Sequence, residues 1–143
     1  MSETIFFVII TIITLSFLYQ SYLDLKYKEI NGKIAFWTFV IAFVAGIYLN
    51  KWWAPIFFFA SFGASWLLHK IKAWEGGDVK IFIAGIVLLS PSQAGLFITN
   101  IAFYGLLWII PFLINKKSKE IPFIPVIALA WFHAVIGINL ISF

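Results

Sequence analysis

Long apolar runs separated by short polar stretches make up this chain. A helix needs about 20 apolar residues to cross a bilayer, and charges, glycines and prolines cut the sequence into runs near that length. The pattern predicts an all-α membrane protein of about six transmembrane helices, forming a single domain over residues 1–143. The expected helices are Thr4 to Leu23, Ile34 to Leu49, Trp53 to His69, Val79 to Leu89, Ala94 to Asn115 and Pro122 to Ser142.

The fourth run, Val79 to Leu89, is too short to cross a bilayer as one helix. Non-helical backbone at membrane depth must be covered by protein, because lipid cannot hydrogen-bond to it. Two arrangements therefore stay open. Either this helix crosses incompletely, or the polar segment before it enters the membrane against other parts of the protein.

Composition supports the membrane interpretation. Hydrophobic residues make up 63% of the chain and charged residues 11%, whereas soluble domains have about 45–50% apolar and about 25% charged residues. The chain has no cysteine, which excludes disulfides, a cysteine nucleophile and thiolate metal sites. The first run, Thr4 to Leu23, has no basic residue before it and no small-residue cleavage motif after it, so we expect a retained spanning helix and not a signal peptide.

The lysines fall in alternate loops. They cluster in the segments 24–33, 70–80 and 116–119, whereas the turns 50–52 and 90–93 hold only Lys51 between them. Because positively charged loops stay on the cytoplasmic side, we expect the lysine-rich segments to be cytoplasmic and both termini to be non-cytoplasmic. The net charge of +4 is therefore a sign of topology in the cell membrane, and we expect no nucleic-acid partner.

The only two aspartates, Asp24 and Asp78, stand where an apolar run meets a lysine-bearing loop. An ionisable residue at a bilayer edge is costly unless it is paired or used, so each is a candidate functional residue. If folding brings them together, two like charges cannot both ionise at low dielectric, and the pair would share one proton. Such a pair can activate a water for peptide hydrolysis without any metal or cofactor. The other interpretation is that each aspartate caps a loop or pairs with its neighbour, Lys26 or Lys80.

Three segments resemble the motifs of type IV prepilin peptidases. Asp-Leu-Lys-Tyr-Lys-Glu-Ile-Asn at 24–31 is similar to the family's first aspartate motif, in which Asp-Leu-Arg/Lys is followed by Ile-Pro-Asn. Glu-Gly-Gly-Asp-Val-Lys at 75–80 resembles its Gly-x-Gly-Asp-x-Lys motif, which presenilin-type intramembrane proteases share in shorter form. Ile-Pro-Phe-Ile-Pro at 121–125 resembles an Ile-Pro-Phe-Gly-Pro segment. The resemblance covers nearly the whole chain.

The resemblance implies an aspartyl endopeptidase with Asp24 and Asp78 as catalytic residues. Its substrate would be a prepilin-like or preflagellin-like membrane protein, whose short basic leader is cut at the cytoplasmic face just before a hydrophobic helix. The sequence leaves the oligomeric state open. The residues expected to bind substrate or support the site are Gly76, Gly77, Lys80, Glu75, Lys26, Asn31 and Pro122.

Three positions depart from the family's pattern. Glu75 replaces the first motif glycine and brings a third carboxylate to the site, Asn31 replaces a proline, and Ile124 replaces a glycine. Members that also methylate the new amino terminus usually carry a cytoplasmic insertion with paired cysteines. This chain has neither, so it resembles the short archaeal form, and we assign it no methyltransferase activity.

A few other polar residues point to different functional classes. Ser65 and His69 stand four apart on one helix face, a spacing that would suit a serine hydrolase, but a helical serine more often bonds to its own helix carbonyl. His69 and His133 form no His-Glu-x-x-His motif, which argues against a zinc protease. A small ion-coupled transporter that uses the same carboxylates and an inactive homologue that serves as a scaffold remain the alternatives.

Overall fold

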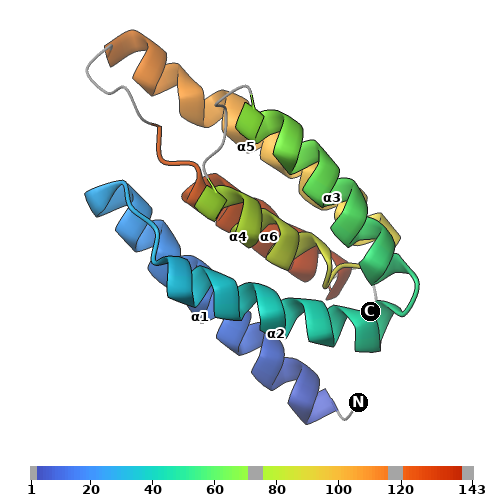
Figure 1. The fold of residues 1–143 in the computed structure, drawn as a ribbon. Helices are drawn as coiled ribbons and strands as arrows, with labels where there is room; N and C mark the ends of the chain where they lie inside the picture. Colours follow the sequence, from blue (N-terminus) through green and yellow to red (C-terminus); the bar gives the residue numbers. More distant parts are fainter. Residues whose placement is uncertain (1–2, 71–75, 116–120, 140–143) are drawn as a thin grey trace.

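The protein is a bundle of helices. The computed structural model describes residues 3–70, 76–115 and 121–139, and this part of the chain contains helices and no strand (Figure 1). The all-helical expectation is therefore confirmed. The helices in these residues are α1 (Glu3–Tyr27), α2 (Gly32–Asn50), α3 (Trp53–Lys70), α4 (Gly76–Ile86), α5 (Pro91–Asn115) and α6 (Ile124–Asn139).

The two aspartates lie within helices, although we expected both at the junctions with loops. α1 continues through Asp24 to Tyr27 and ends at Lys28, whose φ is 53° and whose N–H donates to the Asp24 carbonyl at 3.0 Å. A left-handed residue of this kind is a common helix stop. α4 begins at Gly76, so Asp78 lies in its first turn, where the helix dipole favours a negative charge.

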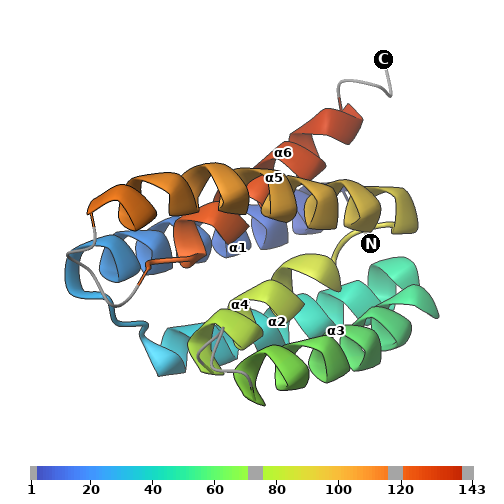
Figure 2. The same ribbon diagram turned by 90° about the horizontal axis from the view of Figure 1, so that it is seen from above.

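α4 is the central helix and packs against α2, α3 and α6. Figure 2 shows it between the α2–α3 pair and the helices α1, α5 and α6. Its 11 residues extend about 16 Å, which is about half the thickness of the hydrocarbon core of a bilayer. Ile81, Ala84 and Val87 are completely buried. α4 is thus a short helix that protein covers, and the two membrane arrangements that the sequence leaves open stay predictions.

The end of α4 is held by α2. Beyond α4 the chain turns, and the Asn50 side chain donates from Nδ2 to the carbonyls of Val87 at 3.4 Å and Leu89 at 3.2 Å. Both carbonyls belong to the turn that directly follows α4, where buried main-chain groups need partners from elsewhere in the protein. Gly46 lies so close that a Cβ there would collide with the Val87 carbonyl oxygen. The backbone of α2 therefore meets the backbone of the residue that directly follows α4.

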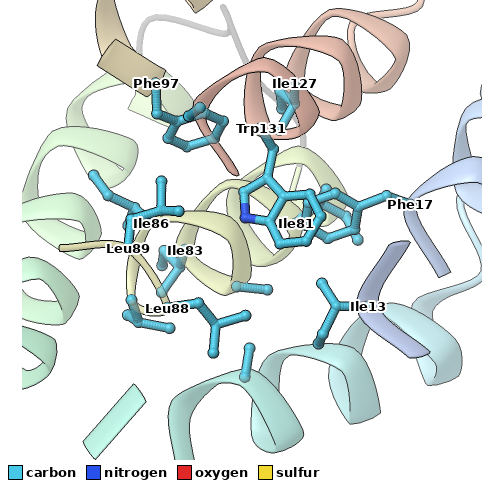
Figure 3. Packing of buried hydrophobic residues seen from close by; sticks show 14 of the residues in the cluster. Ile13, Phe17, Ile81, Ile83, Ile86, Leu88, Leu89, Phe97, Ile127 and Trp131 are labelled. Carbon is cyan, nitrogen blue, oxygen red and sulfur yellow. The ribbon is translucent and has the colours of Figure 1, made fainter. Parts of the chain in front are cut away.

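The helices α1, α4 and α6 are joined by one set of contacts, which we call the Trp131 layer. It consists of Phe17 on α1, Gly85 on α4 and Trp131 on α6. The rings of Phe17 and Trp131 meet edge to face with their centroids 5.1 Å apart, and Trp131 Nε1 donates to the Gly85 carbonyl at 3.2 Å. Figure 3 shows Phe17 and Trp131 approaching one another from their two helices, with Ile81 of α4 beside them.

The outer surface is apolar on every long helix. Leu15, Trp37, Phe59 and Leu106 are all more than half exposed, and Phe59 reaches 70%. So much exposed apolar surface is unusual for a soluble monomer and fits a lipid environment. By length and hydropathy α1, α2 and α5 can each cross a membrane, and the apolar part of α6 is shorter. The full number of crossings and the placement of the termini stay predictions.

The α2–α4 contact generates a first prediction. Gly46→Ala should lower the free energy of unfolding by about 1–3 kcal/mol, because the added methyl must displace backbone atoms and not a flexible side chain. Thermal or denaturant unfolding in detergent measures this. The matched control is Gly63→Ala on α3, where a Cβ meets nothing within 4 Å, and its stability should be unchanged or higher. Equal stability of the two variants would contradict the close approach.

Candidate active site

Asp24 links the end of α1 to the start of α6. Its side chain is only 7% exposed, and its Oδ2 accepts a hydrogen bond from the Ile124 N–H at 2.9 Å. Ile124 is the first residue of α6, and the first amides of a helix have no partner inside the helix. A carboxylate satisfies such a donor and interacts favourably with the helix dipole. Because the bond uses the main-chain N–H of Ile124, the isoleucine side chain that replaces the motif glycine does not prevent it.

The segment before α6 is held by α5. Pro122 is buried, and its carbonyl accepts from Trp108 Nε1 at 2.9 Å. The Phe123 carbonyl accepts from the Val126 N–H at 3.1 Å, which closes the first turn of α6. Pro122, expected as a supporting residue, therefore lies two residues before the amide that binds Asp24, and Trp108 fixes its position.

Asn31 and Gln20 build the turn that follows Asp24. Gln20 is completely buried; its Nε2 donates to the Asn31 carbonyl at 2.9 Å, and its Oε1 accepts from the Asn31 N–H at 3.0 Å. Asn31 Oδ1 in turn accepts from the amides of Lys33 and Ile34 and so caps α2. Where the family has a proline, this chain fixes the turn with these bonds. The sequence pattern alone does not indicate this role of Gln20.

Asp78 is 9% exposed in the first turn of α4. Beside it, Gly77 packs directly on Ile30 of the α1–α2 turn: a Cβ at Gly77 would lie 2.6 Å from Ile30 Cδ1 and 3.1 Å from Ile30 Cβ. The turn that follows Asp24 therefore rests on the helix start that carries Asp78. Gly77 supports the site by allowing this contact, and Gly76 begins the helix.

The Trp131 layer places both aspartates at the same end of the bundle. Asp24, Asp78 and Ile124 are each seven residues away from a member of that layer on their own helix. Seven residues are about two helical turns, or about 10 Å along the axis, and return to nearly the same face. α1 runs toward this end, whereas α4 and α6 start from it (Figure 1). The two carboxylates thus lie at a similar level, on helix faces that both turn toward α6.

The remaining expected site residues, Lys26, Lys80 and Glu75, do not share one environment. Lys26 is exposed, donates to the Tyr22 hydroxyl at 2.9 Å and lies 5.0 Å from the centre of the Tyr27 ring, which is a cation–π contact. Lys80 is half-buried and lines a pocket between α2, α3 and α4. Glu75 lies outside the described residues.

The structure does not support Ser65 as a nucleophile. Ser65 is completely buried, and its Oγ has no hydrogen-bond partner in the described part of the chain, so His69 does not activate it. Within residues 3–70, 76–115 and 121–139 no three His, Cys, Asp or Glu side chains come together in a way that could hold a metal ion.

These features define a class of protein: a helical protein with apolar outer surfaces and two buried carboxylates at one end of the bundle. Residues 9–114 match the model of the Type IV leader peptidase family, and since this is well over half of the chain, the protein belongs to that family. The match includes Asp24 and Asp78, whereas the 121–125 segment lies beyond it. Among curated proteins and among solved structures, none matches the chain.

The contact between Gly77 and Ile30 generates a second prediction. Gly77→Ala should lower the free energy of unfolding by about 1–2 kcal/mol, because its methyl needs the space that Ile30 occupies. In an Ile30→Ala background the same substitution should cost less, with a coupling energy of about 0.5 kcal/mol or more in a double-mutant cycle. Unfolding of the four proteins in detergent measures this coupling. Strictly additive effects would show that the two residues do not share one space.

Proposed function

We propose that this protein is an aspartic-type endopeptidase that removes the basic leader from prepilin-like or preflagellin-like membrane proteins at the cytoplasmic face. Membership of the Type IV leader peptidase family supports a prepilin-type leader peptidase in general. The observation that carries the choice of residues is the burial of the chain's only two aspartates at one end of the bundle. Burying a carboxylate is costly unless its position serves a purpose.

In the proposed mechanism the two carboxyl groups share one proton. The ionised carboxylate takes a proton from a water as the water oxygen attacks the scissile carbonyl carbon, and the protonated carboxyl donates to the carbonyl oxygen. A proton then passes to the amide nitrogen as the carbon–nitrogen bond breaks. The bond from the Ile124 amide to Asp24 Oδ2 fixes the orientation of that carboxylate, which is the kind of preorganisation that catalysis requires.

The surroundings of the aspartates fit a substrate that is part charged and part apolar. The apolar outer surface lets the hydrophobic helix of such a substrate stay in lipid while its leader reaches the helix ends. Glu29 is exposed in the turn after α1, and a carboxylate there attracts a basic leader. Glu75 and Glu120, which have the same sign of charge, lie outside the described residues.

Substitution of either aspartate tests the mechanism. Asp24→Asn and Asp78→Asn should each reduce leader cleavage by about 100-fold or more, since an amide keeps the shape of the carboxyl group but cannot exchange a proton. The measurement is the small mass loss of a prepilin-like protein from the same genome, co-expressed with each variant. Glu3→Gln makes the same chemical change at the start of α1, far from the site, and should cleave normally.

Rapid cleavage by either aspartate variant would contradict the paired mechanism. If the variants lose an ion flux and no cleavage is ever seen, the transporter alternative replaces the proposal. A wild-type chain that binds prepilin-like proteins without cutting them would instead indicate a scaffold.

Orientation is a separate prediction. Reporter tags at Lys28, Lys72 and Lys117 should be cytoplasmic, and tags at Lys51 and Ser92 should be outside, because lysine-rich loops are retained on the cytoplasmic side. Protease accessibility or compartment-specific reporters give the answer. A tag at Lys28 found outside would put the end of α1, and with it Asp24, on the wrong face for a cytoplasmic leader.

A further inference from the structure

We propose that Gln20 is a positioning residue for the two aspartates. Its side-chain amide fixes the turn between α1 and α2, and this turn sets the separation of the Asp24 and Asp78 carboxyl groups. The proposal rests on the leader peptidase function and adds a residue to its site. Gln20 acts on the reaction through the main chain of Asn31, and not by contact with the substrate.

Both ends of the Gln20 amide bind the same residue. Nε2 donates to the Asn31 carbonyl at 2.9 Å, Oε1 accepts from the Asn31 N–H at 3.0 Å, and the Gln20 side chain is completely buried. We call these two bonds the Gln20–Asn31 pair. Because one planar amide supplies both the donor and the acceptor, a shift of the turn breaks both bonds at once. Each broken bond would leave a buried polar group unsatisfied, which is costly.

The Gln20–Asn31 pair fixes the turn where the family's motif has a proline. Residues 28–31 connect α1 to α2 outside either helix. Asn31 has a φ of −72°, which is within the narrow range that the ring of proline imposes. A proline would hold this angle through its ring, but it has no N–H and could not accept the bond to Gln20 Oε1. In this chain two hydrogen bonds therefore replace the constraint of the ring.

Ile30 carries the position of the turn to α4. It directly precedes Asn31, and it packs on Gly77 so closely that a Cβ there would lie 2.6 Å from Ile30 Cδ1. Gly77 is the residue before Asp78. The turn and the start of α4 lie at the same end of the bundle (Figure 2). A displaced turn would therefore lose its contact with the residue beside Asp78.

Gln20 is also tied to Asp24, which lies one helical turn later on α1. Since helical backbone is rigid over one turn, the Gln20–Asn31 pair connects the helix that carries Asp24 with the turn that packs beside Asp78. The Ile124 amide orients the Asp24 carboxylate, and the pair sets its distance from the other carboxyl group. A water that reacts between two carboxyl groups needs both, because a misplacement of about 1 Å can cost about 100-fold in rate.

The first test removes the Gln20–Asn31 pair. Gln20→Met keeps the length of the side chain but makes neither bond. For a prepilin-like protein from the same genome, kcat should fall about tenfold or more, whereas KM should change less than about twofold. Ser21→Ala is the matched control, since Ser21 is also buried on α1 but donates to the Phe17 carbonyl of its own helix. This control should keep its kcat.

A comparison with Gly46→Ala separates positioning from stability. Gly46→Ala is expected to destabilise the protein at the opposite end of α4, and it should keep its kcat at temperatures where the protein stays folded. Under the same conditions, with the folded fraction measured in detergent, Gln20→Met should lose kcat. If Gln20→Met lowers stability as Gly46→Ala does and leaves kcat unchanged, Gln20 is only a structural residue and the proposal is overturned.

The variant Asn31→Pro gives a second kinetic test. The proline ring holds φ near the value that Asn31 already has, and it removes the N–H that Gln20 binds. In the Asn31→Pro background, Gln20→Met should therefore lower kcat by less than about threefold, compared with about tenfold in the wild-type chain. The same loss in both backgrounds would overturn the proposal, because Gln20 would then act without the turn.

A disulfide measures the position of the turn without any cleavage assay. The chain has no cysteine, so Ile30→Cys and Gly77→Cys introduce the only pair. A Cβ at Gly77 lies 3.1 Å from Ile30 Cβ, close to the separation of about 3.8 Å in disulfides. Under mild oxidation the bond should form about fivefold faster with Gln20 than with Gln20→Met.

Equal rates of disulfide formation would overturn the proposal even if the kinetic variants do not fold. If the wild-type protein cleaves no prepilin-like protein, the peptidase function fails. The rate of disulfide formation then still decides whether Gln20 fixes the turn against α4, so the two failures give different results.

Discussion

The hydrogen bond from the Ile124 amide to Asp24 joins two parts of the chain that are 100 residues apart. An apolar bundle must satisfy every buried polar group internally, because an unpaired one costs several kcal/mol in such a medium. At this end of the molecule the requirement is met by side chains that bond to main chain: Asp24 to α6, Gln20 to the turn before α2, and Trp108 to the segment before α6. The arrangement around the candidate site follows from these bonds.

Each of these bonds also removes a degree of freedom from the site. The Asp24 carboxylate is fixed by a helix start, the helix start is fixed by α5, and the turn after Asp24 rests on Gly77. A proteolytic pair of carboxyl groups must be held within a fraction of an ångström of a productive geometry. Positions set by helix ends and buried bonds meet that need better than positions on a free loop.

The sequence predicted the helical fold, six apolar segments and two aspartates as the candidate residues, because these depend on composition and local pattern. The family resemblance is confirmed by the match over residues 9–114, whereas the roles of the individual site residues stay predictions. The helix ends were wrong near both aspartates. The apolar pattern stops at Leu23, but α1 continues because Asp24 and Lys26 find partners, Ile124 and Tyr22, that periodicity cannot reveal.

The short length of α4 sets the position of Asp78 along the bundle axis. At its far end, the bonds from Asn50 and the close approach of Gly46 tie the chain to α2. The Asp78 carboxylate lies at the other end of this 11-residue helix. Its position along the helix axis therefore depends on where the far end of α4 is attached to α2. One inserted residue would raise it by about 1.5 Å and turn it by about 100°, away from α6. The number of residues in α4 thus determines how far the Asp78 carboxylate lies from the contact with α2 at the opposite end of that helix.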